Sequence, residues 1–135
     1  MPWRDALVRE GAAQLRHLHA LLTSRPYASR VPDQALLVQT SDDILHQAAT
    51  RGDGYAFVDS PQGRAMHVDL GRFPGQRITS WWFDPRTGRH EPGETFDNPR
   101  VRRTFTCPTE GDGADWVLVL DDEARKFPPP GLRRD

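Results

Sequence analysis

Six short runs of β-forming residues, separated by stretches rich in glycine, proline and aspartate, recur along the sequence after residue 34. The runs are Ala35–Val38, Tyr55–Asp59, Ala65–Leu70, Arg77–Phe83, Val101–Thr106 and Trp116–Leu120. Short strands with turn residues between them are typical of a two-sheet sandwich or a small barrel. We therefore predict a mainly β fold, a small antiparallel β-sandwich that extends from Ala35 to Asp122.

Apolar and polar residues alternate along these runs. Met66, Val68 and Leu70 share one face of their strand, whereas His67 and Asp69 share the other, because successive side chains of a strand point to opposite sides. Tyr55 with Phe57, and Trp116 with Leu118 and Leu120, follow the same rule. Each strand thus offers an apolar side to a core between two sheets. The run Asp84–Gly88 contains a proline near its start and ends in a glycine, which readily adopts a positive φ. It therefore predicts a hairpin turn.

The N-terminal segment has a different period. Between Trp3 and Leu22, apolar residues recur at spacings of three and four, which predicts one amphipathic helix. The helix should end before Arg25, because the following proline disfavours helical dihedrals. We divide the chain into a helix and extended linker (1–34), a sandwich (35–122) and a proline-rich flexible tail (123–135).

Charge and composition exclude several classes of partner. The formal net charge is −1 and the basic residues are interspersed with acidic ones, so we expect no nucleic-acid partner. No apolar stretch approaches the roughly 20 residues that cross a bilayer, and the first residues lack a signal peptide's pattern. We expect no membrane association, and the localisation stays open. Cys107, the only cysteine, excludes an intrachain disulfide and a thiolate cluster.

The sequence contains no recognisable catalytic motif. The acidic pairs Asp42–Asp43 and Asp121–Asp122 lie at predicted element ends, where acids cap or solvate turns. His67 and Asp69 are only two possible metal ligands and fit a solvated face better. Asp112–Asp115 is too poor in ligands for a calcium loop and is interpreted as a turn. We predict no catalytic residue, no cofactor and no metal.

Trp81 and Trp82 are the most informative neighbours. They must point to opposite faces of their strand, so only one fits easily in the inter-sheet core. The other ring is either exposed, where it would suit a sugar ring or a partner, or buried against the N-terminal helix or a missing domain. The tentative binding residues are Trp81, Trp82, Tyr55 and Arg86.

The order of residues from about Trp3 to Asp122 resembles the C-terminal region of apiosidase-like glycoside hydrolases. In that family a (β/α)₈ barrel ends in a helix and linker similar to the segment from Trp3 to Gln34, and a β-sandwich with a collagen-binding label follows. The sandwich motifs present here are Tyr55-Ala56-Phe57-Val58, Val68-Asp69-Leu70, Trp81-Trp82-Phe83-Asp84-Pro85-Arg86-Thr87-Gly88 and Asp115-Trp116-Val117-Leu118-Val119-Leu120-Asp121-Asp122. The family's catalytic acids lie upstream, in the barrel, so none can be assigned to this chain.

The resemblance implies a non-catalytic accessory domain that packs on a catalytic barrel, absent here, through the N-terminal helix. One alternative is a stand-alone module that binds glycan or collagen with the tryptophan pair and Tyr55 or Arg86. Another is a purely structural domain that completes an enzyme encoded by a neighbouring reading frame.

Overall fold

The computed structural model describes residues 16–17, 19–25, 30–37, 47–60, 65–109 and 115–130. Within these ranges the chain is mainly β, as predicted. The strands are β1 (Val31–Pro32), β2 (Ala48–Gly52), β3 (Tyr55–Ser60), β4 (Met66–Asp69), β5 (Arg77–Asp84), β6 (Arg89–Asp97), β7 (Arg102–Phe105) and β8 (Trp116–Asp122). Three 3₁₀ turns join them: η1 (Gln34–Leu36), η3 (Leu70–Arg72) and η4 (Glu123–Arg125).

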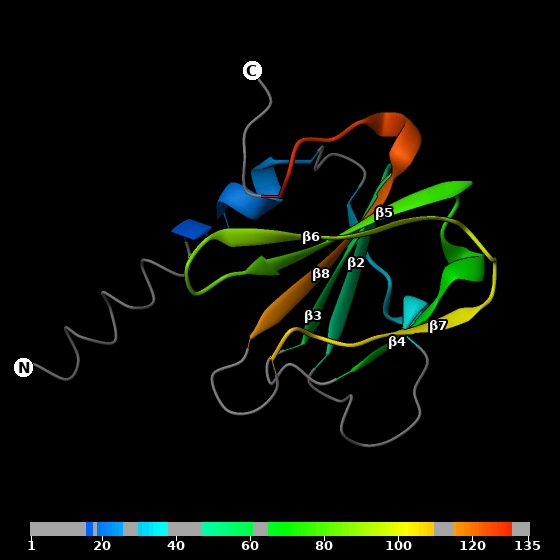
Figure 1. Cartoon of the computed structure of the whole chain (residues 1–135), viewed down its shortest axis with the longest axis horizontal. Helices are drawn as coiled ribbons and strands as arrows, with labels where there is room; N and C mark the ends of the chain where they lie inside the picture. Colours follow the sequence, from blue (N-terminus) through cyan, green and yellow to red (C-terminus); the bar gives the residue numbers. More distant parts are fainter. Residues whose placement is uncertain are drawn as a thin grey trace, which may run out of the picture.

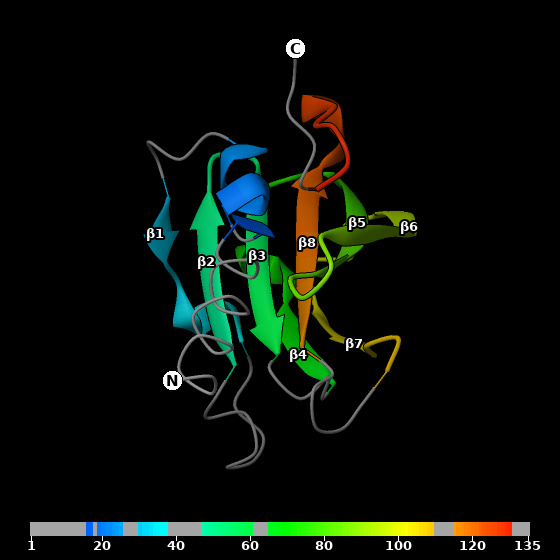
Figure 2. The same cartoon turned by 90° about the vertical axis from the view of Figure 1, so that its left-hand side faces the viewer.

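The strands form two antiparallel sheets, and the predicted small β-sandwich is confirmed. The larger sheet has the order β1-β2-β3-β8-β5-β6, and β4 pairs with β7 in the smaller one. Figure 2 shows the larger sheet with β4 and β7 behind it, and Figure 1 shows β6 and β7 on the same side of the molecule. β6 is an edge strand of the larger sheet and β7 is an edge strand of the smaller one, so two sheet edges lie on this side of the sandwich.

The core between the sheets is built from alternate residues of each strand. Ala56 and Val58 of β3 are paired with Leu120 and Leu118 of β8 and lie on the inner face. Met66 and Val68 of β4, Ile78 of β5 and Phe105 of β7 complete this core with other buried side chains. The alternation seen in the sequence assigned the inner face of β4 and β8 correctly. It was wrong for β3, because Tyr55 and Phe57, predicted to face the core between the sheets, lie on the outer face and the smaller Ala56 and Val58 face the core.

The outer face of the larger sheet is also apolar. Its buried cluster contains Tyr55, Phe57, Phe83, Val117 and Val119, joined by Leu21 from the N-terminal segment. We call these six residues the outer-face cluster. Because β8 lies at the centre of the sheet and is covered on both faces, Trp116 to Leu120 are all buried, a pattern expected of a strand with two dry faces.

Some predicted strand boundaries were wrong. In the run Ala35–Val38, Ala35 and Leu36 lie in η1, Leu37 makes only an isolated bridge to Val68, and Val38 lies outside the described residues. Leu70, predicted at the end of a strand, begins η3. A short apolar run does not by itself distinguish a strand from a buried turn.

Strands β1, β2 and β6 were not predicted. β6 is the clearest case, because it is rich in charged residues and contains Pro92. A charged strand with proline is suited to an edge, where unpaired backbone groups face solvent. The hairpin that leads into it was predicted correctly: the Gly88 amide donates to the Asp84 carbonyl at 2.8 Å, and Gly88 has a φ of 77°.

Strands β5 and β6 are offset by a bulge between Thr79 and Trp81. The Ser80 hydroxyl accepts from the Glu94 amide at 2.8 Å and donates to the Glu94 carbonyl at 3.1 Å. Gly93 packs directly against this serine, because a Cβ at residue 93 would lie 2.4 Å from Ser80 Oγ and 2.8 Å from the Ser80 carbonyl oxygen.

Gly93→Ala should therefore lower the free energy of unfolding by about 1–3 kcal/mol, the usual cost of overpacking. Urea denaturation measures this change. Pro92→Ala, at the exposed neighbouring position, is the control and should change stability by less than about 1 kcal/mol. Equal effects of the two variants would show that the bulge tolerates a side chain.

The two ends of the described chain both lie against the larger sheet. Residues 16–17 and 19–23 are helical, and Figure 2 shows them in front of β2 and β3. The predicted helix from Trp3 to residue 15 lies outside the described residues. At the other end, in the segment assigned to the tail, η4 follows β8 directly and Phe127 packs against the outer-face cluster. No helix among the described residues is long and apolar enough to cross a membrane.

Candidate functional site

The tryptophan pair divides between the two faces of the larger sheet, as the alternation predicts. Trp82 packs against the inter-sheet core, with its ring 6.4 Å from that of Trp116. Trp81 packs against the outer-face cluster, which includes Leu21 of the N-terminal helical segment. Both indoles remain partly accessible. The two rings cannot act as one platform.

The other two residues predicted for binding lie elsewhere. Tyr55 has 0 % exposure, and its hydroxyl accepts from Arg30 Nε at 2.8 Å. A ligand cannot reach this tyrosine in the folded chain. Arg86 is exposed at the β5–β6 turn, where it donates to both carboxylate oxygens of Asp84 at 3.0 and 3.1 Å. Burial raises the pKa of Asp84, but the bonds from Arg86 outweigh it and hold the pKa below its usual value.

A buried ion pair ties the N-terminal segment to the sheet. Arg25 Nε donates to Asp121 Oδ1 at 3.0 Å and Nη2 to Oδ2 at 2.7 Å, with side-chain exposures of 0 % and 4 %. The guanidinium also lies 5.0 Å from the Phe127 ring centroid. Burial raises the pKa of Asp121, and the bonds from Arg25 only partly oppose that rise. Asp121 was predicted to cap or solvate a turn, and that interpretation was wrong.

Arg30 forms a second connection between the same segment and the sheet. Its guanidinium lies 5.4 Å from the Tyr55 ring centroid and 5.2 Å from that of Phe57. The same group donates to the Leu22 carbonyl at 2.6 Å. One side chain thus links the helical residues, the linker and β3. Stacking of this kind adds to hydrogen bonding because the guanidinium is attracted to the ring faces.

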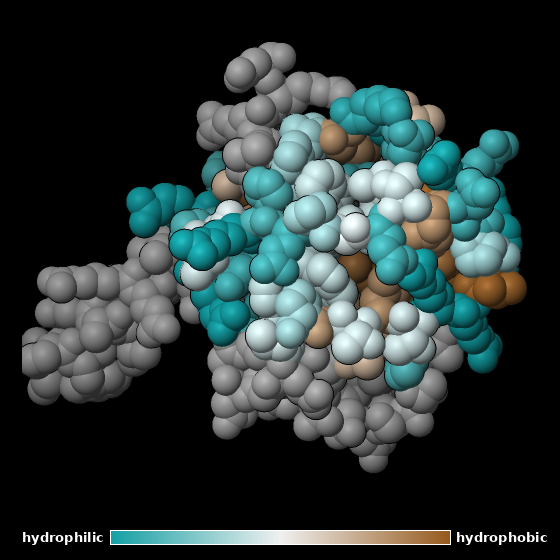
Figure 3. All heavy atoms as spheres, in the orientation of Figure 1, coloured by the Kyte–Doolittle hydropathy of each residue, from teal (hydrophilic) through white to brown (hydrophobic). Residues whose placement is uncertain are grey.

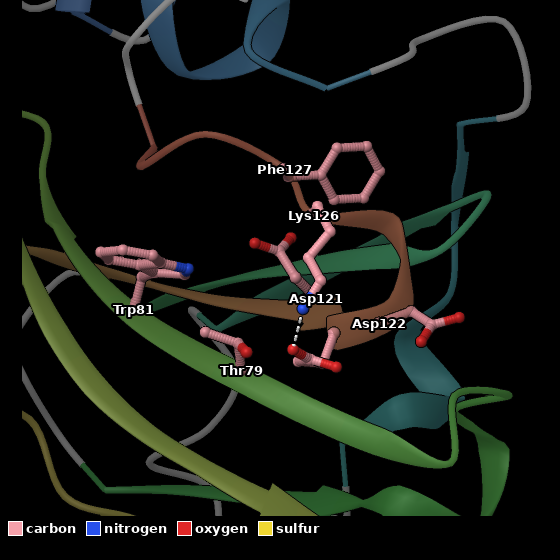
Figure 4. A pocket seen from close by; sticks show the side chains of 7 residues that line it. Thr79, Trp81, Asp121, Asp122, Lys126 and Phe127 are labelled. Atoms are coloured by element: carbon pink, nitrogen blue, oxygen red, sulfur yellow. Dashed lines mark hydrogen bonds and ion pairs between the residues drawn. The ribbon is translucent and has the colours of Figure 1, made fainter.

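A small pocket of about 160 Å³ lies beside the buried ion pair. Its lining includes Thr79, Trp81, Asp121, Lys126 and Phe127, and Figure 4 shows the indole nitrogen of Trp81 on the side that faces Asp121. Trp81 Nε1 is buried and makes no hydrogen bond of regular geometry among the described residues, but it lies near enough to Asp121 to help oppose the rise of that pKa. Asp122, at the pocket rim, caps η4 by accepting from the Ala124 amide at 3.2 Å, in agreement with its predicted role.

Two carboxyl groups interact on the outer face of the sheet. Burial, a hydrogen bond with Asp115 and repulsion from the Asp115 charge together raise the pKa of Asp59 to about 8. Asp59 therefore carries a proton at neutral pH, because two neighbouring carboxylates avoid ionising together.

Among the described residues, no group of three or more histidine, cysteine or acidic side chains could hold a metal ion. Asp69 accepts from the Gly71 amide at 3.0 Å as the cap of η3.

A larger groove of about 460 Å³ opens between β5–β6 and β7. Trp82 and Phe105 provide its aromatic surface, and Arg103 of β7 forms an ion pair with Glu94 of β6. In the orientation of Figure 1, Figure 3 shows apolar residues recessed between hydrophilic ones in the region where β6 and β7 face each other. We call this feature the inter-sheet groove.

The family of the chain follows from a comparison with family models. Residues 31–121 match the family described as "Putative collagen-binding domain of a collagenase". The chain belongs to this family. The match begins at β1 and ends in β8, so its limits coincide with those of the larger sheet. The match begins at Val31, four residues before Ala35, the predicted start of the sandwich.

Two solved glycoside hydrolase structures contain a part similar to this chain. One is a glycoside hydrolase family 5 protein from Bacteroides vulgatus, with 31 % identity and a TM-score of 0.82 over 93 % of this chain and 27 % of that chain. Another, titled "Glycoside hydrolase", has 32 % identity and a TM-score of 0.79 over 92 % of this chain and 28 % of that chain. The chain thus spans just over a quarter of the length of these relatives, and the resemblance to glycoside hydrolases is confirmed. A search of the curated proteins finds no match.

Arg25 and Arg30, which organise the outer face, were not predicted as functional residues. Arg25 precedes a proline and Arg30 follows it closely, so both were assigned to a linker. A charged side chain in a short extended segment gives no sign of its partner when that partner, Asp121, is 96 residues away in sequence. The motif around Trp116–Asp122 could have suggested that Asp121 has a basic partner, because an acid at the end of a continuously apolar strand requires a counter-ion if it is buried.

Proposed function

We propose that this family member is a non-catalytic accessory domain that supports the catalytic barrel of a glycoside hydrolase-like protein through its N-terminal segment. The observation that carries the proposal is the buried Arg25–Asp121 ion pair, which anchors that segment to the centre of the larger sheet. Arg30 adds the bonds to Tyr55 and to the Leu22 carbonyl. Arg25 and Arg30 therefore anchor the N-terminal side of the sandwich to the larger sheet.

This anchoring favours support over tethered binding. Modules that act as independent binding units are commonly joined by flexible, exposed linkers with few contacts. In this chain Leu21, Ser24 and Arg25 are instead buried, with Leu21 in the outer-face cluster. The matched part of the Bacteroides vulgatus protein extends beyond the family limits to 93 % of this chain, which supports a shared arrangement of the N-terminal segment and the sandwich.

The proposal predicts no glycosidase activity for this chain alone, because its role is to support residues that lie in another part of the enzyme. Purified protein should release no nitrophenol from aryl glycosides above a buffer control. Turnover above that control, copurifying with the folded protein and retained in an Arg25→Met variant, would overturn the non-catalytic assignment.

The supporting role is tested in a chimera. This chain replaces the matched portion of the Bacteroides vulgatus glycoside hydrolase, and thermal unfolding of the chimera is compared with that of the truncated relative. We expect the chimera to melt at a higher temperature than the truncated protein, since burial at the junction stabilises both parts. Arg25→Met in the chimera should remove much of that gain. A chimera that is no more stable than the truncated protein would contradict the proposed supporting role.

The inter-sheet groove favours a second function, the binding of a polymer such as glycan or collagen by the sandwich. Trp82 lines this groove, whereas Trp81 lies on the opposite face and Tyr55 is buried. A binding site built from the groove is therefore different from the four-residue set predicted from the sequence.

A further inference from the structure

We propose that the inter-sheet groove binds a segment of a neutral oligosaccharide, with a sugar ring stacked on Trp82. This inference goes beyond the supporting role and does not depend on it. The groove volume of about 460 Å³ lies within the range of roughly 300–1,000 Å³ that holds small ligands. Trp82 in its lining comes from the inner face of β5, whereas the N-terminal segment packs on the outer face of the larger sheet, so a ligand and a supported barrel would use different faces.

The aromatic surface of the groove is held in place from behind. Trp82 packs edge-on against Trp116, whose indole N–H donates to Thr109 Oγ1 at 2.8 Å. Phe105 lies 6.3 Å from Phe96, between the two sheets. A rigid indole that is partly exposed presents a flat apolar surface at little entropic cost, and the C–H face of a sugar ring packs on such a surface.

The rim of the groove contains both hydrogen-bond donors and hydrogen-bond acceptors. Arg103 is placed by two aromatic rings, 4.2 Å from the Phe96 centroid and 4.9 Å from that of Phe105. It forms an ion pair with Glu94 across the groove. Thr104 and Thr106 also line the groove, with the Thr104 hydroxyl hydrogen-bonded to His67 Nδ1 at 2.9 Å. A donor and an acceptor side by side match vicinal sugar hydroxyls, which both donate and accept.

Electrostatics favour a neutral ligand. The guanidinium of Arg103 and the carboxylate of Glu94 cancel, so the groove has no excess charge for a polyanionic chain. An acidic glycan would have to displace Glu94 from Arg103 before it could use the arginine. A neutral glycan can accept from one group and donate to the other while the pair remains intact.

A peptide ligand is disfavoured by the edge strand beside the groove. Addition of a strand requires a regular row of free backbone groups. In β6, Pro92 has no N–H to donate, and the amide and carbonyl of Glu94 are already bonded to Ser80 Oγ. The bulge between Thr79 and Trp81 interrupts the register at the same point. The side chains of the groove, rather than its backbone, are therefore available for recognition.

The test measures binding of cellohexaose, xylohexaose and arabinohexaose to the full chain by titration calorimetry, with a triple-helical Gly-Pro-Hyp peptide in parallel. At least one oligosaccharide should bind. Arg103→Gln should weaken that binding about tenfold, because a charge-assisted hydrogen bond is lost. Arg102→Gln is the matched control, since Arg102 precedes Arg103 on β7, is exposed and points to the opposite face; it should bind like the parent.

A second pair of variants tests the groove independently of Arg103, in case an arginine variant does not fold. Trp82→Phe should weaken binding about tenfold through loss of stacking area, whereas Trp81→Phe, on the opposite face, should not. Thermal melts confirm that each variant is folded, and Glu94→Gln replaces any variant that is not. Absence of binding by all three oligosaccharides at millimolar concentration would overturn the proposal. So would binding unaffected by changes at Trp82, Arg103 and Glu94, or peptide binding that depends on Trp82.

Discussion

Replacing Arg25 by methionine should lower the free energy of unfolding by about 3–5 kcal/mol, which is the usual cost of breaking a buried ion pair by removing one partner. The side chain of Asp121 is only 4 % exposed, so its carboxylate would be left in a dry environment without a counter-ion. Urea denaturation at neutral pH measures the loss. We also expect the pKa of Asp121, already raised by burial, to rise further in this variant.

Two controls separate charge from packing in this experiment. Arg125→Met removes an exposed partner of Asp53 and should cost about 1 kcal/mol or less. The double variant Arg25→Met, Asp121→Leu removes both charges and should recover most of the stability, because an apolar pair of similar volume avoids the desolvation cost. A loss below about 1 kcal/mol in Arg25→Met would show that the pair is hydrated in solution.

The stability of the chain should fall as the pH rises from about 4 to about 8, owing to Asp59. The folded chain keeps a proton on Asp59 up to its pKa of about 8, whereas the unfolded chain loses it near the ordinary value of 3.8. Between these values the folded state binds more protons, so each pH unit removes roughly 1 kcal/mol of stability. The contribution of this group is fully present below about pH 4 and is lost above about pH 8.

Asp59→Asn should abolish this slope, because the amide keeps a donor for Asp115 and cannot ionise. The variant should be more stable than the parent at pH 9 and similar to it at pH 4. Urea unfolding at several pH values measures both effects. Asp97→Asn, at an exposed position of β6, is the matched control and should keep the slope of the parent. A parent whose stability is constant between pH 5 and 8 would contradict a shared proton at this site.

The proposed supporting role and the proposed binding at the inter-sheet groove involve opposite faces of the larger sheet. The outer face holds the N-terminal segment through Arg25 and Arg30, while the inner face lines the inter-sheet groove through Trp82. Strand β5 contributes Trp81 to one face and Trp82 to the other. The alternation of a β-strand therefore allows adjacent residues to serve different surfaces.

The sequence alone determined the fold class, the main strands and the separation of the two tryptophans. These features depend on local rules: alternation assigns a residue to a face, and the Asp84–Gly88 run specifies a hairpin through its own backbone preferences. It also determined the family, because the order of several motifs is retained along the chain. Local rules also explain the failure at β6, where a charged edge strand lacks the apolar pattern that marks its buried neighbours.

Only the tertiary structure decided which side chains share a site. Tyr55 and Trp81 pack on one face, Trp82 lies on the other, and Arg86 is paired with Asp84, so the structure does not bring the four predicted binding residues together. The partnership of Arg25 with Asp121 and the pairing of Arg103 with Glu94 join residues on different elements. The first pair depends on the packing of the N-terminal segment on the larger sheet and the second on the packing of the two sheets, and no spacing along the chain encodes such long-range contacts.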